Sequence, residues 1–158
     1  MTNPNEIDAK DLTSTLSGVA GEYFVAAELS RRGYIASITL RNSKGVDVLC
    51  SSANATKSVG IQVKTSKYSE SKWLLNKKSE DYYANNLFYV FVKLNYNQKS
   101  PDYFIVPSKV VATATREGHK KWLDTPGKKG QKHNDSSMRV FGDKEGEYCG
   151  RWELLGLE

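Results

Sequence analysis

The first half of the chain carries a helical pattern of apolar residues. Between residues 18 and 32 they recur at spacings of three and four, which predicts an amphipathic helix. Ser17 is expected to cap its start, and Gly33 to end it in the left-handed conformation. The apolar positions that define this pattern are Val19, Tyr23, Ala26, Ala27 and Leu29.

Three strands are predicted after this helix, over residues 34–40, 46–51 and 59–66, because β-branched and apolar residues are concentrated there. Residues 41–45 form a turn by composition, and a polar loop joins the last two strands into a hairpin. Side chains in a strand alternate between its two faces, so Asp47, Gln62 and Lys64 can share one face of this hairpin.

The second half of the chain predicts a further set of elements around one long apolar run. That run, residues 87–94, is too short for a membrane span and reads as a central strand covered on both faces. The other predicted elements are a strand at 73–75, a helical turn at 79–85, a neighbouring strand at 102–106, a helix at 109–116 capped by Ser108, and a C-terminal helix that docks through Tyr148, Trp152 and Leu155.

Length and composition favour one domain over residues 1–158, with residues 1–13 as a loose N-terminal arm. No run of about 18 apolar residues occurs, so no membrane partner is expected. The polar start does not resemble a signal peptide, so a cytoplasmic location is expected. Cys50 and Cys149 are far apart and are expected to be buried, small apolar residues.

The net charge of +5 favours a polyanionic partner without requiring one. Several basic residues gather in the polar loop 125–137, which reads either as a solvated surface loop or as a flap that contacts phosphates. The basic residues of this loop are Lys128, Lys129, Lys132 and His133.

A carboxylate, an amide and an ammonium on one strand face are suited to holding a divalent metal and a phosphate. Asp47 can supply a charged oxygen ligand, and Gln62 a neutral one. Lys64 can stabilise negative charge on the phosphate, or position and deprotonate the attacking water. Glu22 can reach the metal if its helix packs behind the hairpin; the alternative is an exposed residue that complements the helix dipole.

The order of helix with Glu, strand with Asp and strand with Gln-x-Lys resembles the PD-(D/E)XK nuclease superfamily. The matching segments are residues 21–34, 45–47 and 61–66. The likeness is greatest to the archaeal-type Holliday-junction resolvases and the methylation-dependent restriction enzymes. Val46 stands where the superfamily name has Pro, and Gln62 removes one negative charge from the pocket.

This resemblance implies an α/β protein with a restriction-endonuclease-like mixed β-sheet core flanked by helices. It also implies residue roles: Asp47 as metal ligand, Gln62 and the carbonyl of Val63 as further ligands, Lys64 as the catalytic lysine, and Glu22 as an aid to metal binding. The metal would be Mg²⁺ or Mn²⁺. Ser66, Lys67 and Arg139 are further candidates for contact with nucleic acid, each with a structural alternative.

The leading hypothesis is therefore a metal-dependent endonuclease that hydrolyses phosphodiester bonds in DNA, in defence or in repair and recombination. Such enzymes often work as homodimers, and RNA is left open as the target. The alternatives are a catalytically inactive nucleic-acid-binding module of the same fold and a basic partner-binding protein. Tyr82, Tyr83, Trp73 and Trp122 can stack on bases or belong to the core, and the two histidines do not form a zinc site.

Overall fold

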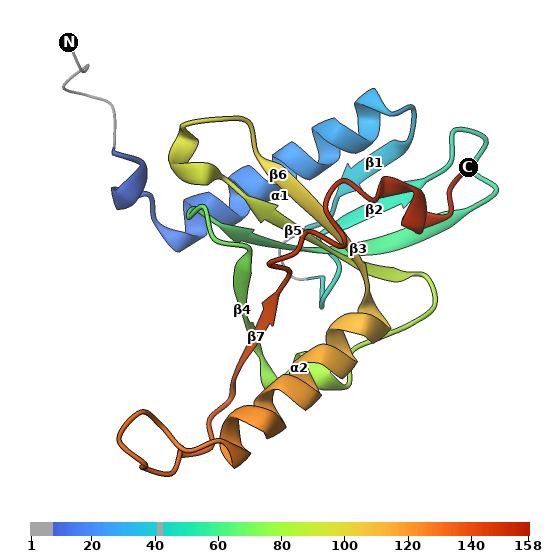
Figure 1. Ribbon diagram of the computed structural model, residues 1–158. Coiled ribbons are helices and arrows are strands. Elements are labelled where there is room, and N and C mark those ends of the chain that lie inside the picture. The colour runs from blue at the N-terminus through green and yellow to red at the C-terminus, as the bar shows by residue number, and fades with distance from the viewer. Residues whose placement is uncertain (1–7, 41–42) are drawn as a thin grey trace.

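A five-stranded sheet with helices on both faces forms the centre of the computed structural model, which describes residues 8–40 and 43–158 (Figure 1). In chain order the elements are η1 (Ala9–Asp11), α1 (Ser14–Arg31), β1 (Ile35–Ile38), β2 (Val48–Ser51), β3 (Ser58–Ser66), β4 (Lys72–Asn76), η2 (Lys77–Glu80), β5 (Leu87–Lys93), η3 (Asn95–Asn97), β6 (Asp102–Pro107), α2 (Ser108–Asp124), β7 (Met138–Gly142) and η4 (Trp152–Leu155).

The sheet is mixed, with the strand order β1-β2-β3-β5-β6. Strand β2 is antiparallel to both β1 and β3, β3 and β5 run parallel, and β5 and β6 are antiparallel. The parallel pair requires a long crossover, and this connection contains β4 and η2. Strand β4 pairs with β7 in a separate two-stranded sheet. The predicted α/β architecture is confirmed.

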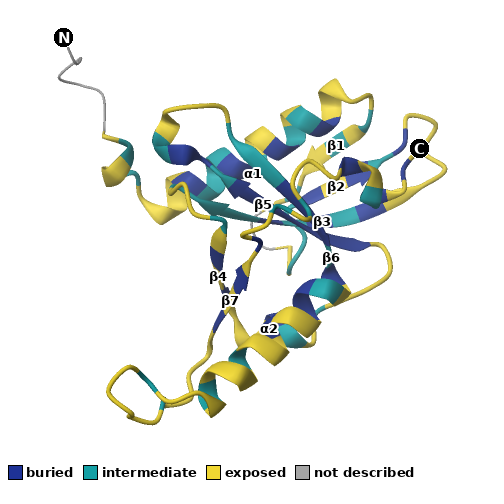
Figure 2. Ribbon diagram, in the orientation of Figure 1, coloured by how far each residue is buried: buried dark blue, intermediate teal, exposed yellow. Residues whose placement is uncertain are grey.

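Two apolar clusters cover the two faces of the sheet. On one face Val25 and Leu29 of α1 pack against the strands, and on the other Val111 of α2 packs with the aromatic residues of β4 to β7. Strand β5 is buried along nearly its whole length, as Figure 2 shows by its dark blue colour. The prediction of a doubly covered strand over residues 87–94 is confirmed.

Helix α1 begins earlier than predicted and turns a different side to the sheet. Thr13, not Ser17, is its N-cap, and its hydroxyl accepts a hydrogen bond from Leu16 N at 3.2 Å. Every fourth residue is buried: Ser17, Gly21, Val25 and Leu29. Small residues occur on this face because α1 lies very close to β3: a β-carbon on Gly21 would overlap Oγ1 of Thr65 and lie 3.0 Å from its Cβ. Of the predicted apolar face, Leu29 is fully buried and Tyr23 is 65% exposed.

Several other predictions change in the structure. Helix α2 runs to Asp124, well beyond the predicted residue 116, and Ser108 is its first residue, with its hydroxyl donating to the Ala84 carbonyl. The predicted C-terminal helix is wrong, since only the short η4 forms there. Strand β7 was not predicted. Residues 1–7 of the predicted arm and 41–42 of the predicted turn lie outside the described residues.

The two cysteines differ from each other. Cys50 is buried, as expected, and burial raises the pKa of its thiol to about 11. Cys149 is exposed, so the prediction that it is buried is wrong. Over the described part of the chain, no helix has the length and apolar character needed to cross a membrane.

Candidate active site

Asp47 lies where the β2–β3 ladder ends. Val48 pairs with Ile61, and one step further the backbone N–H of Asp47 donates to the Ile61 carbonyl at 2.8 Å. The next donor of β3, Val63 N, bonds to Oδ2 of Asp47 at 2.7 Å. The carboxylate thus takes the place of a backbone acceptor, which is why β2 begins at Val48 and not at the predicted residue 46.

The Val63 carbonyl faces the same edge of β3 as the Asp47 carboxylate. In an extended strand the N–H and C=O of one residue point to the same side, and Val63 N is directed at Asp47. The predicted ligand pair of a carboxylate and a backbone carbonyl is therefore consistent with the local backbone.

Gln62 and Lys64 project from β3 to the face opposite α1. There they line a cavity of about 460 Å³, and both side chains are half-buried. Within residues 8–40 and 43–158 neither the Gln62 amide nor the Lys64 ammonium makes a hydrogen bond or an ion pair. Two half-buried polar groups without a protein partner are available to a ligand.

Asp47 also acts electrostatically on this cavity. Tyr89, the partner of Gln62 on β5, forms part of the cavity wall. Burial raises the pKa of the Tyr89 hydroxyl to about 12, with smaller contributions from neighbouring Tyr82 and from the negative charge of Asp47. Asp47 itself does not line this cavity, so the prediction that its side chain shares one face of the hairpin with those of Gln62 and Lys64 is not confirmed.

Glu22 lies on the other side of the sheet from Gln62 and Lys64. It follows Gly21, the residue of closest approach between α1 and β3, and it lines a cavity of about 290 Å³ together with Asp47. The structure thus brings Glu22 to Asp47, and Asp47 to the backbone between Gln62 and Lys64.

The oxygen groups around Asp47 are of the kinds that a hard divalent cation prefers, but Gln62 and Glu22 lie on opposite sides of the sheet. Mg²⁺ and Mn²⁺ prefer carboxylate, amide and carbonyl oxygens, and Asp47, Gln62, Val63 and Glu22 supply those three kinds. No cluster of three or more His, Cys, Asp or Glu side chains suited to a metal exists in the described part of the chain. Any metal here would depend on the amide and the carbonyl, which carry no charge.

The turn before Asp47 is held by a residue whose role the sequence did not reveal. Gly45 has φ +72°, and a β-carbon there would overlap the end of the Tyr82 ring. The Tyr82 hydroxyl donates to the Lys44 carbonyl at 3.4 Å. The sequence identifies Tyr82 only as an aromatic residue, because its approach to this turn depends on the tertiary fold. The other cavity-lining residues missed by the sequence are Lys44, Leu75, Asn76, Lys78, Ser79 and Tyr89.

Ser66 and Lys67 follow Lys64 in the sequence, and all three residues line a second cavity of about 410 Å³. The Ser66 hydroxyl accepts from Tyr68 N at 3.2 Å. The Lys67 ammonium donates to the Lys10 carbonyl and, at 3.1 Å, to that of Leu12. Lys67 therefore fastens the segment around η1, part of the arm predicted to be loose.

Arg139 has the structural role that the sequence left open as the alternative to a contact with nucleic acid. Its side chain is 3% exposed and pairs with Glu80. The same guanidinium donates to the Ser136 carbonyl at 2.7 Å and to the Met138 carbonyl at 2.9 Å. Trp73 is likewise structural, because its ring is buried and its Nε1 donates to the Val92 carbonyl at 3.0 Å.

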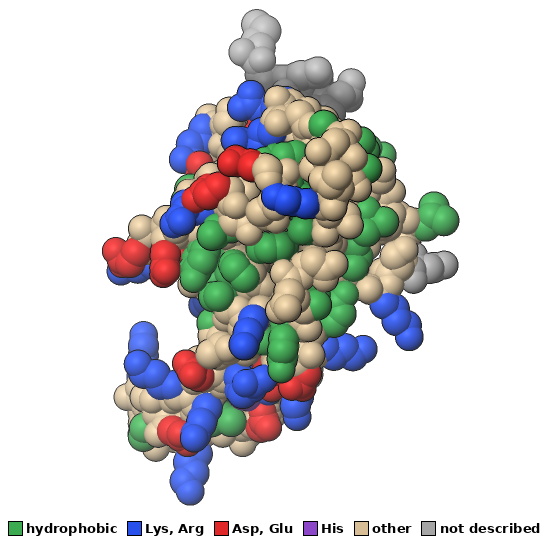
Figure 3. Space-filling view, turned by 90° about the vertical axis from the view of Figure 1, so that its right-hand side faces the viewer, with side chains coloured by type: hydrophobic (Ala, Val, Ile, Leu, Met, Phe, Trp, Pro, Cys, Tyr) green, Lys and Arg blue, Asp and Glu red, His purple; other side chains and the backbone are tan. Residues whose placement is uncertain are grey.

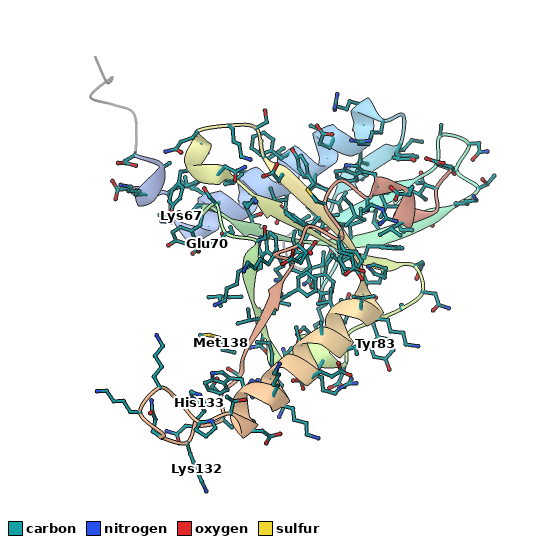
Figure 4. The ribbon with its side chains drawn as sticks, viewed as in Figure 1. Lys67, Glu70, Tyr83, Lys132, His133 and Met138 are labelled. Carbon is teal, nitrogen blue, oxygen red and sulfur yellow. The ribbon has the colours of Figure 1, made fainter. Side chains whose placement is uncertain are left out.

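The basic loop with Lys128, Lys129, Lys132 and His133 lies at the far end of α2 from the sheet (Figure 4). None of its residues lines the Gln62–Lys64 cavity, and its three lysines are exposed, as the surface-loop alternative expects. The His133 ring stacks on Trp122, with centroids 4.1 Å apart. In Figure 3 the lower part of the molecule shows Lys and Arg side chains mixed with Asp and Glu.

Two solved structures resemble the chain along most of its length. One is a bacterial homing endonuclease, I-Ssp6803I, with a TM-score of 0.52, 10% identity, and coverage of 90% of this chain and 91% of that one. The other is Hjc from Archaeoglobus fulgidus, a Holliday junction resolvase from an archaeal hyperthermophile, with a TM-score of 0.52, 11% identity, and coverage of 89% and 97%. The sequence matches no protein-family model and no curated protein.

This likeness establishes the fold. The chain shares the restriction-endonuclease-like fold of these two nucleases, as the sequence resemblance implied.

Proposed function

We propose that the protein is a Mg²⁺- or Mn²⁺-dependent endonuclease that hydrolyses phosphodiester bonds in DNA, in defence or in repair and recombination. The observation that carries this proposal is the hairpin end, where the Asp47 carboxylate is bonded to Val63 N between Gln62 and Lys64. Support comes from the fold, which a homing endonuclease and a Holliday junction resolvase share.

In this proposal Asp47, Gln62, the Val63 carbonyl and Glu22 hold the metal, which supplies Lewis-acid activation of the phosphate and of water when bound. The hydrogen bond from Val63 N fixes the orientation of the Asp47 carboxylate. Lys64 lines the cavity, where its ammonium would stabilise negative charge that develops on the phosphate and position the attacking water, or its neutral amine would accept the proton of that water.

The test is DNA cleavage with and without Mn²⁺ on plasmid, linear, single-stranded and four-way-junction substrates. Asp47→Asn keeps an acceptor for Val63 N while removing the charge, and Lys64→Met keeps the length of the side chain. Both substitutions are expected to abolish cleavage. Lys57→Met is the matched control, because Lys57 lies at the opposite end of the hairpin and bonds to the Glu158 carbonyl. Cleavage that survives both substitutions refutes the proposal.

Metal binding is tested separately by calorimetry with Mn²⁺. Wild type is expected to bind the ion, and Asp47→Asn is expected to bind it much more weakly, because the site then loses its charged oxygen ligand. Equal Mn²⁺ affinity of the two proteins would show that Asp47 is not a metal ligand.

A second candidate is a nucleic-acid-binding module of the same fold that does not cut. It is favoured by one observation, that the described residues contain no cluster of three acidic, His or Cys side chains suited to a metal. This candidate predicts DNA binding with a steep dependence on salt and no cleavage. No binding at all would favour a basic protein-binding module. A homodimer, RNA as target, a single domain and a cytoplasmic location stay predictions.

A further inference from the structure

The cavity beside Gln62 and Lys64 has the size and the walls of a small-ligand pocket. Its volume of about 460 Å³ lies within the range of about 300–1,000 Å³ that such pockets occupy. Leu75, Tyr82 and Tyr89 give it apolar and aromatic walls, and two of these three side chains, Leu75 and Tyr89, are buried. A phosphate group alone would gain no favourable contact from apolar and aromatic side chains.

The polar residues of the cavity lie around those walls. Lys44 and Lys78 are exposed and join Lys64, so three ammonium groups border an apolar interior. The amides of Gln62 and Asn76 also line it. An apolar planar body with polar edges, attached to a negatively charged backbone, matches this arrangement, and a nucleotide has that chemistry.

We propose that this cavity receives one unpaired nucleobase next to the scissile phosphate, so that the preferred substrate is a nucleic acid with an unstacked nucleotide at the cutting site. This inference rests on the proposed function, and it adds the substrate class. The base lies against Tyr82 and Leu75, and its flanking phosphates contact the lysines at the border.

The preference follows from the position of bases in a duplex. Bases inside a duplex are stacked and paired, and moving one into a protein pocket costs unstacking and unpairing energy. That cost is lowest where the base is already unpaired, as in a bulge, a gap or a single strand. A cavity with aromatic walls directly beside Lys64 therefore selects against continuous duplex.

Tyr82 determines the shape of the pocket. Its ring end abuts Gly45, and its hydroxyl donates to the Lys44 carbonyl at 3.4 Å, so the ring is fixed as a wall. The adjacent Tyr83 is 51% exposed, does not line the cavity and lies beside α2 (Figure 4). The two tyrosines form a matched pair for a test.

The experiment measures binding of two DNA duplexes without a catalytic metal, by fluorescence anisotropy. The duplexes differ only by one central unpaired 2-aminopurine. Stacking of a base on an aromatic side chain changes affinity by about five- to 150-fold. Wild type is expected to bind the duplex with the unpaired base about tenfold more tightly than the fully paired duplex. The 2-aminopurine fluorescence is expected to change on binding.

Tyr82→Leu is expected to bring this preference close to one, whereas Tyr82→Phe and Tyr83→Leu retain it. A preference is a ratio within one protein, so a partial loss of folded protein cancels. Should Tyr82→Leu fail to fold, Lys78→Trp replaces it, because an indole from this exposed border position fills the cavity mouth. Lys78→Trp is likewise expected to remove the preference.

The inference is overturned if wild type binds both duplexes equally, or if the preference survives both Tyr82→Leu and Lys78→Trp. These results are distinguishable from failure of the proposed function. Cleavage of paired DNA without any preference would keep the nuclease and refute the pocket. A preference without cleavage in Mn²⁺ would keep the pocket and refute the nuclease.

Discussion

Strands β3 and β7 each carry one basic side chain in an alternating pattern, and the two side chains lie in opposite surroundings. Lys64 of β3 lines an open cavity and makes no ion pair with any described residue. Arg139 of β7 is buried, paired with Glu80 and bonded to two backbone carbonyls. In β7 it is the apolar neighbours, Met138 and Val140, that are exposed.

The difference shows what alternation does and does not determine. Period two establishes which residues share a face of a strand, but the covering elements decide which face is closed. One face of β3 is closed by α1, so the polar residues face the cavity. The Arg139 face of β7 packs toward the aromatic cluster, so its guanidinium needs an internal partner.

The largest expected effect follows from Lys64. Lys64→Met should lower the DNA cleavage rate by about 10²- to 10⁴-fold, the usual loss for a removed proton-transfer or charge-stabilising group. Thermal unfolding should change little, because no described protein group loses a partner. Rates are measured at saturating Mn²⁺, with unfolding followed by circular dichroism. A stable variant that cuts at the wild-type rate would contradict the assignment.

Arg139 should show the reverse behaviour. Arg139→Met leaves the Glu80 carboxylate without its buried partner, and breaking a buried pair in this way costs about 3–5 kcal/mol of unfolding free energy. Denaturant unfolding measures this loss. Arg151→Met is the control, because the Arg151–Glu153 pair is on the surface and its loss should change stability far less. If both variants lost the same unfolding free energy, the buried Arg139–Glu80 pair would contribute no more to stability than the surface Arg151–Glu153 pair.

The chemistry on β3 was predictable because it is local. Strand alternation places Gln62 and Lys64 on one face of β3, and both side chains line one cavity. Asp47 lies at the edge of β3 and lines the cavity of Glu22, so its place in the same site stays a prediction. The carboxylate-to-Val63 bond was not predictable, since it arises where the ladder ends. The role of Tyr82 was not predictable for a similar reason, because its contact with the Lys44–Gly45 turn joins segments that are far apart in sequence.

The fold shows the same division. The long apolar run of β5 and the polar alternation of β3 identify their strands, because burial on both faces or on one face leaves a direct pattern. The buried face of α1 was predicted incorrectly, because half of it consists of small residues, Ser17 and Gly21, and not of large apolar ones. Strand β7 was missed because its apolar residues Met138 and Val140 face outward.

A smaller effect is expected on the closed face of β3. Gly21→Ala should destabilise the protein by up to about 2 kcal/mol, because overlap with Thr65 costs about 1–3 kcal/mol and the gain in helix propensity offsets about 1. Gly18→Ala, in the same helix, meets nothing within 4 Å and should be neutral or stabilising. Denaturant unfolding of the two variants measures the difference. Equal stabilities would show that α1 can move away from β3 without cost.

The smallest expected effect separates a lysine with protein partners from one without. The Lys67 ammonium bonds to the carbonyls of Lys10 and Leu12. The Lys72 ammonium, on the border of the same cavity, is exposed and makes no hydrogen bond or ion pair with the described residues. Each phosphate contact contributes about 0.9 to the slope of log affinity against log salt on duplex DNA. Lys72→Gln should lower this slope by about that amount, and Lys67→Gln should lower it much less.

The measurement is DNA affinity at several salt concentrations in the absence of a catalytic metal. Lys67→Gln should instead increase proteolysis near residues 9–12, because the segment loses the ammonium that holds it. If Lys67→Gln lowered the slope as much as Lys72→Gln, the Lys67 ammonium would exchange its two carbonyls for a phosphate on binding. Protein partners would then prevent a basic side chain from binding DNA only where they are buried, as for Arg139. Carbonyl groups near the surface would not prevent a lysine from binding a phosphate.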